Sequence, residues 1–266
     1  MAIVKSVKNP TMLPNFLIVG AQKAGTTAAA RNLALHPSVS IYTGTTEYGQ
    51  KELEFFNQHW ERGISWYSRH FESSAALHGE KTAELLHRTI CHRRMHETNP
   101  RFKLIVLLRS PIERAYSQWK MATFTKGDES DTFDVAIRRE LESLSDAKSR
   151  EMFYNCCPSG KSNWREGYLM KGMYAEQLDS LYQWFPKRQV LVVVSERIRE
   201  NLATGYNAFF DFLGLSPVKA NFLEHYVGRE APPMNAETRR LILRVYREPN
   251  EKLFSLLGMS IPEWTR

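Results

Sequence analysis

The feature that most constrains this chain is an apolar run that ends in a glycine loop and continues directly into a helix. Residues 15–20 read NFLIVG, which is typical of a buried strand. The loop GAQKAGTT occupies 20–27, and the strong helix formers of TTAAARNLALH begin at Thr26. A strand, a glycine loop and a helix in this order are typical of an α/β protein built on a parallel sheet.

The remainder of the chain alternates short apolar runs with helical patterns. Further strands are predicted at 39–42, 77–82, 102–108 and 190–194. Helices are predicted from Ile112 to about Ala122 and at 132–144, 174–185, 202–213 and 237–257, the last of them broken near Pro249. Continuously apolar strands fit a parallel sheet with both faces covered. The sequence therefore predicts a doubly wound α/β fold in a single domain over 1–266, with 1–13 as an N-terminal extension.

Composition and charge limit the class of protein. The chain has 266 residues, of which 42% are apolar and 24% are charged, so it can form one large core. A formal net charge of +7 suits an anionic ligand, nucleic acid or an acidic surface without choosing among them. Three cysteines without metal-binding spacing indicate a reducing compartment. The chain start lacks a signal-peptide core and no apolar run is long enough to cross a membrane, so we expect a cytoplasmic protein.

The glycine loop resembles a nucleotide-binding P-loop with its lysine displaced. In the pattern G-x-x-x-x-G-K-[ST] a lysine follows the second glycine, whereas here Thr26 follows Gly25 and Lys23 lies inside the loop. The apolar run that ends at position 108 is followed by Arg109, where a P-loop enzyme has a magnesium-binding acid. Arginine does not ligate Mg²⁺, but its guanidinium pairs well with phosphate. Both differences indicate an anionic group that is transferred without a metal.

At these residues the chain resembles a known enzyme family. FLIVGAQKAGTT is similar to the 5′-phosphosulfate loop of sulfotransferases that use 3′-phosphoadenosine 5′-phosphosulfate (PAPS), and LIVLLRSPIERAYSQW is similar to their 3′-phosphate motif. The likeness extends over most of 14–264 and is closest to the heparan-sulfate-type sulfotransferase domain and its bacterial relatives. It implies a P-loop-like fold, PAPS as the donor, adenosine 3′,5′-bisphosphate as the product, and no metal.

The resemblance also implies which residues bind the nucleotide. The loop residues assigned to the 5′-phosphosulfate are Gln22, Lys23, Ala24, Gly25, Thr26 and Thr27. Lys23 would stabilise charge on the leaving phosphate, and Thr26 and Thr27 also make sense as a helix N-cap pair. Arg109 and Ser117 would bind the 3′-phosphate. Gly228 and Arg229 would close over the nucleotide from a C-terminal loop, in which Val227 replaces the lysine of heparan-type enzymes.

A glutamate is implied as the general base. The register of KELEFF places this role on Glu52, with Glu47 and Glu54 as nearby rivals. An ordinary carboxylate, with a pKa of about 4.3, is a weak base unless it is desolvated. Glu54 would lie on the same strand face as Glu52, or half a turn away on a helix, and would contact the acceptor. Lys81, in GEKTAEL, would contact the sulfuryl group or the base, or form a salt bridge.

Two polar segments have open interpretations. The segment 125–165 is a mobile flap over the site or a surface excursion, and it contains the helix predicted at 132–144. The histidine-rich stretch 87–96 lacks paired cysteines or acids, so we interpret it as a basic solvated helix face rather than a metal site.

The expected acceptor is a hydroxyl, or an amine or guanidine nitrogen, on a small molecule or saccharide, with neither nucleic acid nor a membrane as partner. Two other functions stay open. One is a P-loop metabolite kinase that uses ATP and Mg²⁺, which needs an acid at the position of Arg109. The other is a basic, non-catalytic module that binds polyanions, whose affinity would fall steeply with salt.

Overall fold

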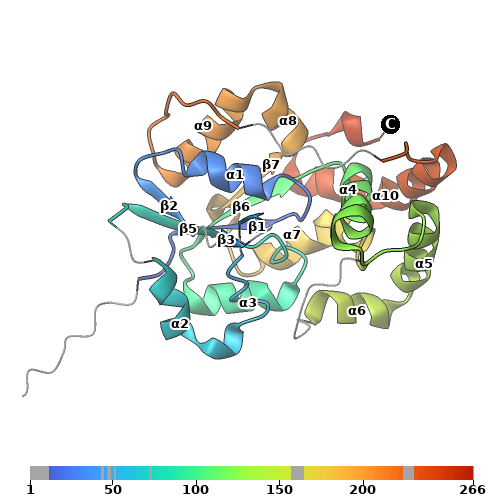
Figure 1. The fold of residues 1–266 in the computed structure, drawn as a ribbon, viewed down its shortest axis with the longest axis horizontal. Helices are drawn as coiled ribbons and strands as arrows, with labels where there is room; N and C mark the ends of the chain where they lie inside the picture. Colours follow the sequence, from blue (N-terminus) through green and yellow to red (C-terminus); the bar gives the residue numbers. More distant parts are fainter. Residues whose placement is uncertain are drawn as a thin grey trace, which may run out of the picture.

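Five parallel strands form the centre of the protein (Figure 1). The structure is a computed structural model that describes residues 12–42, 45–46, 49–50, 52–71, 74–156, 165–223 and 231–265. The strands of the sheet are β1 (Phe16–Gly20), β2 (Val39–Ile41), β5 (Leu77–Lys81), β6 (Lys103–Leu108) and β7 (Val190–Val194). Their order is β2-β5-β1-β6-β7, and β3 (Thr45–Thr46) and β4 (Gly49–Gln50) form a separate antiparallel pair. Every strand predicted from an apolar run is confirmed.

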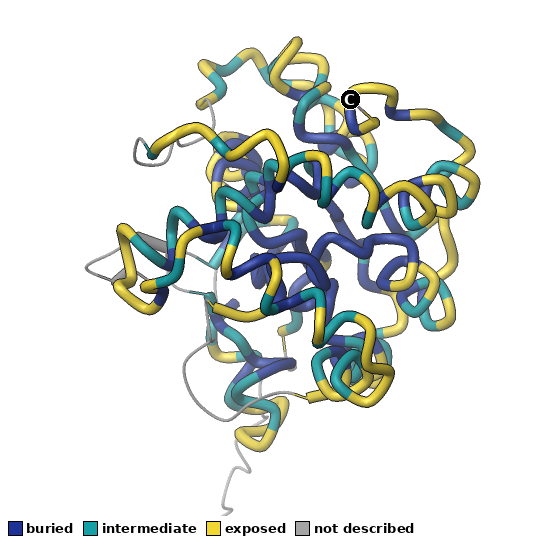
Figure 2. Tube along the Cα trace, turned by 90° about the vertical axis from the view of Figure 1, so that its right-hand side faces the viewer, coloured by how far each residue is buried: buried dark blue, intermediate teal, exposed yellow. Residues whose placement is uncertain are grey.

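Helices cover both faces of this sheet. α1 (Thr26–Leu33) contacts α9 (Leu202–Leu213) on one face, and α3 (Thr89–Thr98) contacts α7 (Tyr174–Tyr182) on the other. Figure 2 shows the buried residues gathered in the interior and the exposed ones on the outside. Strand β1 is central, and its residues from Phe16 to Val19 are fully buried. The doubly wound α/β architecture is therefore confirmed.

A second apolar cluster lies among α4 (Pro111–Met121), α5 (Phe133–Ser145) and α10 (Ala236–Leu257). Its buried side chains include Trp119, Ile137 and Tyr246. Because α10 contacts both α4 and α7, the two clusters belong to one domain. The remaining elements are α2 (Ile64–Ser68), α6 (Ala147–Asn155), α8 (Ser195–Glu200), the π turn η3 (Ala122–Lys126) and the 3₁₀ turns η1 (Trp60–Arg62), η2 (Arg69–Phe71), η4 (Met170–Gly172), η5 (Lys187–Gln189) and η6 (Pro262–Trp264).

The predicted break in the last long helix was wrong. α10 runs continuously through Pro249, which lies inside it. Proline removes one backbone donor and normally kinks a helix. Here Tyr246 and Leu253 are buried on either side of the proline, so packing against the core holds both halves in one helix.

Two interpretations of polar segments also change. The segment 125–165 contains α6 in addition to the predicted helix, which corresponds to α5. The stretch 87–96 is only partly solvated, because His87 and His92 are buried. Burial lowers the pKa of His92 to about 4, so the ring is neutral at physiological pH. Its two nitrogens each lie 3.0 Å from a partner, the Ser180 hydroxyl and the Leu86 carbonyl, and the histidine thus connects α3 to α7.

Candidate active site

Sheet topology brings two of the predicted site segments together. β1 and β6 are neighbours, but the chain leaves β1 toward β2 and leaves β6 toward β7. In open α/β sheets, ligands bind at the carboxyl edge where the connections diverge in this way. The loop after β1 contains Lys23, and Arg109 follows β6. The Arg109 Nη1 atom donates to the Lys23 carbonyl at 3.2 Å, so the two segments are in contact.

The start of α1 is open to an anion. Gly25 is its N-cap in the left-handed conformation (φ 93°), which glycine adopts without steric cost. Glycine has no side chain to cap the first N–H groups, and residues 26–29 of the described helix include no acid. These amides and the helix dipole together favour a bound anion. The N-cap interpretation of the threonines was wrong, because Thr26, which is buried, and Thr27, which is exposed, already lie within the helix.

Lys23 lies in a strongly cationic environment. Its backbone has a positive φ of 70°, and its Nζ lies 3.1 Å from the Met121 sulfur at the end of α4. Burial and the nearby cations together lower the pKa of Lys23 to about 8, the cations being Arg109, Arg114, Lys120 and Lys126. Like charges crowd together here in the free protein, so an anion among them would relieve their repulsion.

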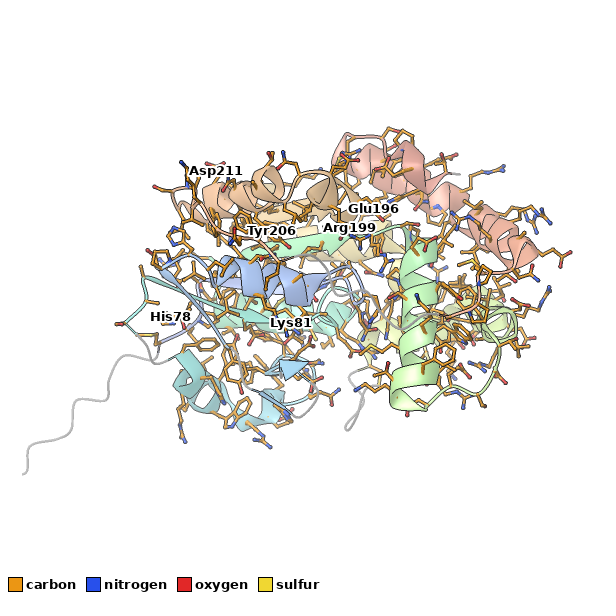
Figure 3. All side chains as sticks on the ribbon, turned by 45° about the horizontal axis from the view of Figure 1, so that its top comes forward. His78, Lys81, Glu196, Arg199, Tyr206 and Asp211 are labelled. Atoms are coloured by element: carbon orange, nitrogen blue, oxygen red, sulfur yellow. The ribbon has the colours of Figure 1, made fainter. Side chains whose placement is uncertain are left out.

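Arg109 has one N–H donor without a hydrogen-bond partner among the described residues. The strand before it ends at Leu108, and α4 begins at Pro111 with Ser110 as its N-cap. The Arg109 Nε atom is buried, and no described residue accepts a hydrogen bond from it. Burial lowers the pKa of Arg109, and Arg199, labelled in Figure 3, lowers it further. An anion beside the guanidinium would satisfy this donor. Ser117 lies half-buried further along α4.

The predicted base and the predicted lysine form an ion pair. Lys81, at the carboxyl end of β5 (Figure 3), places its Nζ 2.6 Å from Glu52 Oε1. The backbone N–H of Ala83 donates to Glu52 Oε2 at 3.3 Å. The Lys81 side chain is 6% exposed and that of Glu52 is 23% exposed, so the carboxylate is held in place yet is accessible. Because β5 is next to β1, this pair lies at the same sheet edge as the loop.

The expected position of Glu54 was wrong, and the other acid, Glu47, lies outside the described residues. Glu54 shares neither a strand face nor a helix with Glu52, because residues 52–54 are irregular and Glu54 has a φ of 52°. Its carbonyl accepts from the backbone N–H of Gln58 at 2.8 Å, which starts a turn. Glu47, Gly228 and Arg229 lie outside the described residues.

A family model for the sulfotransferase domain matches residues 13–228. The chain belongs to the sulfotransferase domain family. It is therefore a sulfotransferase-domain enzyme, and the predicted family is confirmed.

Similar proteins include mammalian and microbial sulfotransferases. Bifunctional heparan sulfate N-deacetylase/N-sulfotransferase 2 of Bos taurus is 30% identical over 96% of this chain. Membrane-associated sulfotransferase kil1 of Dictyostelium discoideum is 26% identical over 92% of it. The chain spans 31% of the bovine protein and 65% of the amoebal one. A sulfotransferase structure from Alicyclobacillus acidocaldarius has a TM-score of 0.73 at 24% identity and covers 96% of this chain and 99% of its own, which confirms the fold.

The structure of the present protein also reveals buried charged residues that the sequence did not predict. Glu80 is fully buried on β5, next to the Glu52–Lys81 pair. Burial raises the pKa of Glu80 to about 8, and the charge of Glu52 adds to this rise, while the hydrogen bond from the Thr82 hydroxyl to Glu80 Oε1 at 3.4 Å opposes it. Strand alternation is the sequence signal that could have identified Glu80 as a buried acid. In the predicted strand 77–82, Glu80 and Lys81 are successive residues and so point to opposite faces of the sheet.

Glu84 and Lys171 were also missed. Both are buried at the loop after β1, where the predicted site residue Gln22 contacts each of them. The signal for Lys171 is its position inside the apolar stretch YLMKGMY, where a charge needs a buried partner. No comparable signal marks Glu84 in the sequence.

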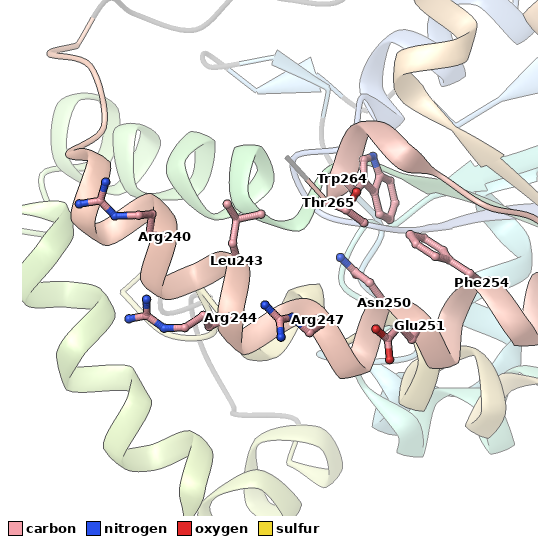
Figure 4. A pocket seen from close by; sticks show the side chains of 9 residues that line it. All are labelled: Arg240, Leu243, Arg244, Arg247, Asn250, Glu251, Phe254, Trp264 and Thr265. Carbon is pink, nitrogen blue, oxygen red and sulfur yellow. The ribbon is translucent and has the colours of Figure 1, made fainter.

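A separate hollow of about 380 Å³ lies between α10 and the C-terminal turn (Figure 4). Arginine side chains from α10 line it, including Arg244 and Arg247, together with the rings of Phe254 and Trp264. Its lining includes none of the described residues that were predicted for the site. This hollow is therefore distinct from the site predicted around Lys23.

Proposed function

We propose that this sulfotransferase moves a sulfuryl group from PAPS to a hydroxyl, or to an amine or guanidine nitrogen, of a small metabolite or saccharide without a metal. The observation that supports this proposal most directly is the contact of Arg109 with the loop that contains Lys23, at the point where the strand connections diverge. This part of the sheet edge combines uncapped amides, a cluster of cations and an unused arginine donor. These features fit a ligand with two separate anionic groups.

The residues present fit the nucleotide at both ends. The amides that follow Lys23, together with its ammonium group, would hold the 5′ end, and Gln22, Ala24, Gly25, Thr26 and Thr27 would complete this side. Arg109 and Ser117 would hold the 3′-phosphate, with Gly228 and Arg229 closing from outside the described residues. When bound, PAPS supplies a sulfuryl group on a phosphate leaving group. Lys23 would stabilise the charge that grows on that leaving group.

Glu52 would act as the general base. Its carboxylate is oriented by Lys81 and by the Ala83 N–H, which leaves its partly exposed side open to an acceptor. Removal of the acceptor proton at this position requires a carboxylate in hydrogen-bond reach of the nucleophile. We assign Glu54 to acceptor contacts as a further part of the proposal.

We also propose the extent and setting of the protein. Residues 1–266 would form one sulfotransferase domain in the cytoplasm, with 1–13 as an extension and 125–165 as a cover over the acceptor side. Within the described residues, none of the helices combines the length and the apolar character that a membrane span needs.

The experiment that tests this function measures release of adenosine 3′,5′-bisphosphate from PAPS with a panel of hydroxyl and amine acceptors in the presence of EDTA. We expect turnover that EDTA does not reduce. A requirement for Mg²⁺ with ATP would favour the kinase alternative instead. Absence of turnover with every acceptor, together with absence of PAPS binding by calorimetry, would contradict the proposal.

A polyanion-binding module makes a different prediction. It would bind without turnover, its affinity would fall steeply as salt rises, and it would tolerate replacement of Glu52. A salt series on binding, run beside the turnover assay, separates this alternative from the enzyme.

A further inference from the structure

Three buried polar side chains connect the loop after β1 to two distant parts of the chain. Gln22 Nε2 donates to Glu84 Oε1 at 3.1 Å, and Lys171 Nζ donates to Gln22 Oε1 at 2.9 Å. Lys171 Nζ also lies 3.7 Å from Glu84 Oε1. Gln22 is 6% exposed, and Glu84 and Lys171 are each 3% exposed, so the network is closed to solvent.

The ionic part of this network is costly in isolation. Burial lowers the pKa of Lys171 to about 8, while the opposite charge of Glu84 counteracts this effect. Two further cations, Arg114 and Arg88, lower the pKa as well, and Glu140 raises it. A buried ion pair commonly adds less stability than apolar residues of the same volume would, whereas removal of one partner is strongly destabilising. Stability alone therefore does not explain why Lys171 and Glu84 are buried together at this position.

The turn that contains Glu84 also holds the proposed base. Glu84 follows Ala83, whose N–H donates to Glu52 Oε2 at 3.3 Å. The same turn is attached to β1 through the Leu86 N–H, which donates to the Val19 carbonyl at 2.8 Å. One side of the turn thus faces the nucleotide loop through Glu84, and the other side faces Glu52 through Ala83.

We propose that Lys171 is a positioning residue that joins the nucleotide loop to the turn behind Glu52, so that the two parts of the site keep one relative position. This inference rests on the proposed function. Lys171 contacts Gln22 and Glu84 and acts through them, because its own side chain is buried. Lys171 belongs to η4. Its side chain packs closely against Gly167, because a Cβ added at Gly167 would lie 2.9 Å from Lys171 Cγ.

The first test compares two ligands that differ only at the 5′ end. Adenosine 3′,5′-bisphosphate uses the loop and Arg109, whereas adenosine 3′-monophosphate lacks the group that the loop would hold. We expect Lys171→Met to weaken the bisphosphate about tenfold by calorimetry and to change the monophosphate less than about twofold. Equal weakening of both ligands, or no weakening of either, would overturn the proposal.

The matched control is Lys103→Met. Lys103 is a half-buried lysine that donates to the Phe212 carbonyl at 2.7 Å, but it lies at the start of β6, on the opposite edge of the sheet. We expect it to leave the affinities of both ligands unchanged. A loss of bisphosphate affinity in this control equal to that of Lys171→Met would show that any lost lysine contact has this effect, and would count against the network.

A second variant keeps the test decisive if Lys171→Met folds poorly. The double variant Lys171→Met with Glu84→Gln removes both buried charges, so we expect its melting temperature to recover toward the wild-type value. We expect its bisphosphate affinity to stay low, because the Gln22 contact with Lys171 is still missing. Recovery of both stability and affinity would show that the pair is only structural, and would overturn the positioning role.

Hydrogen exchange gives a readout that needs no ligand. In the free double variant we expect the Ala83 amide to exchange faster than in the wild type and the Lys103→Met control, because its turn is no longer tied to the loop. Unchanged exchange at Ala83 would contradict the proposal. If the wild type binds neither adenosine nucleotide, the proposed function fails, and this exchange comparison still decides whether Lys171 joins the two segments.

Discussion

Lys81 Nζ lies 2.6 Å from Glu52 Oε1, and the two residues come from segments 29 positions apart. Lys81 is at the carboxyl end of β5, and Glu52 comes from an irregular segment that reaches this end of the strand through the ion pair. The pair therefore places a carboxylate of defined orientation beside the loop that contains Lys23. This relationship leads to the first prediction.

Glu52→Gln should abolish turnover while leaving nucleotide binding intact. The amide cannot accept the acceptor proton, and loss of a general base typically lowers rate by roughly 100-fold or more. The measurement is release of adenosine 3′,5′-bisphosphate from PAPS, with affinity for the bisphosphate measured by calorimetry. Glu142→Gln, at an exposed position of α5, is the control and should behave as wild type. Near-normal turnover in Glu52→Gln would move the base to another residue.

Arg109→Ala should weaken PAPS far more than adenosine 5′-phosphosulfate, which lacks the 3′-phosphate. The unpartnered Nε of Arg109 and its Nη groups would lose a charge-assisted contact, for which a loss of about tenfold or more in affinity is expected. Competition binding with both nucleotides checks this difference. Arg188→Ala, which removes an exposed arginine of η5, should change neither affinity. Equal weakening of the two nucleotides would remove the 3′-phosphate assignment.

Nucleotide binding should take up a proton near pH 8. In the free protein the pKa of Lys23 is about 8, so about half of the molecules have a neutral Lys23 at that pH. A bound anion stabilises the charged form and raises this pKa, so binding at pH 8 should take up about half a proton. Calorimetry in buffers of different ionisation enthalpy measures the uptake. Lys23→Met should reduce it at pH 8, and an uptake that this variant leaves unchanged would assign the titration elsewhere.

Glu80→Gln should change how stability depends on pH. The folded protein keeps the proton of Glu80 up to a pH of about 8, whereas the ordinary pKa of this group is 4.5. The unfolded chain therefore binds fewer protons in this window, and the wild-type free energy of unfolding falls as pH rises from about 4.5 to 8.

The glutamine variant should lack this decline. Relative to wild type, its free energy of unfolding should rise by roughly 3 kcal/mol between pH 5 and pH 8. Denaturant unfolding at a series of pH values measures the difference. Parallel pH profiles for the two proteins would show that Glu80 is already ionised in the folded state at neutral pH.

Local patterns in the sequence were sufficient to predict the strands, the glycine loop and the helix that follows it. Phe16 to Val19 are apolar at every position, which fits only a strand buried on both faces, and Gly25 marks the turn before α1. Both signals depend on neighbouring residues in the chain. The same is true of the motif after β6, where Arg109 directly follows the strand and Ser110 caps the next helix.

Local sequence pattern gave a wrong prediction at two places. The proline in α10 did not break the helix, because Tyr246 and Leu253 pack into the core on either side of it. Glu54 did not take the strand or helix position that its spacing suggested, because a turn begins at its carbonyl. Packing against distant residues outweighs the proline in the first case, and a local turn replaces the expected strand or helix in the second.

The sequence by itself determined the fold class and the family, and it predicted the charged residues of a nucleotide site. Only the tertiary structure decided which of those charges are buried and what each one contacts. Gln22 meets Lys171 across 149 positions of sequence, and Glu80 becomes a neutral acid only because the folded protein excludes water from it. The physical reason is that strand and loop formation depend on adjacent side chains, whereas desolvation and charge pairing depend on which segments the completed fold brings together.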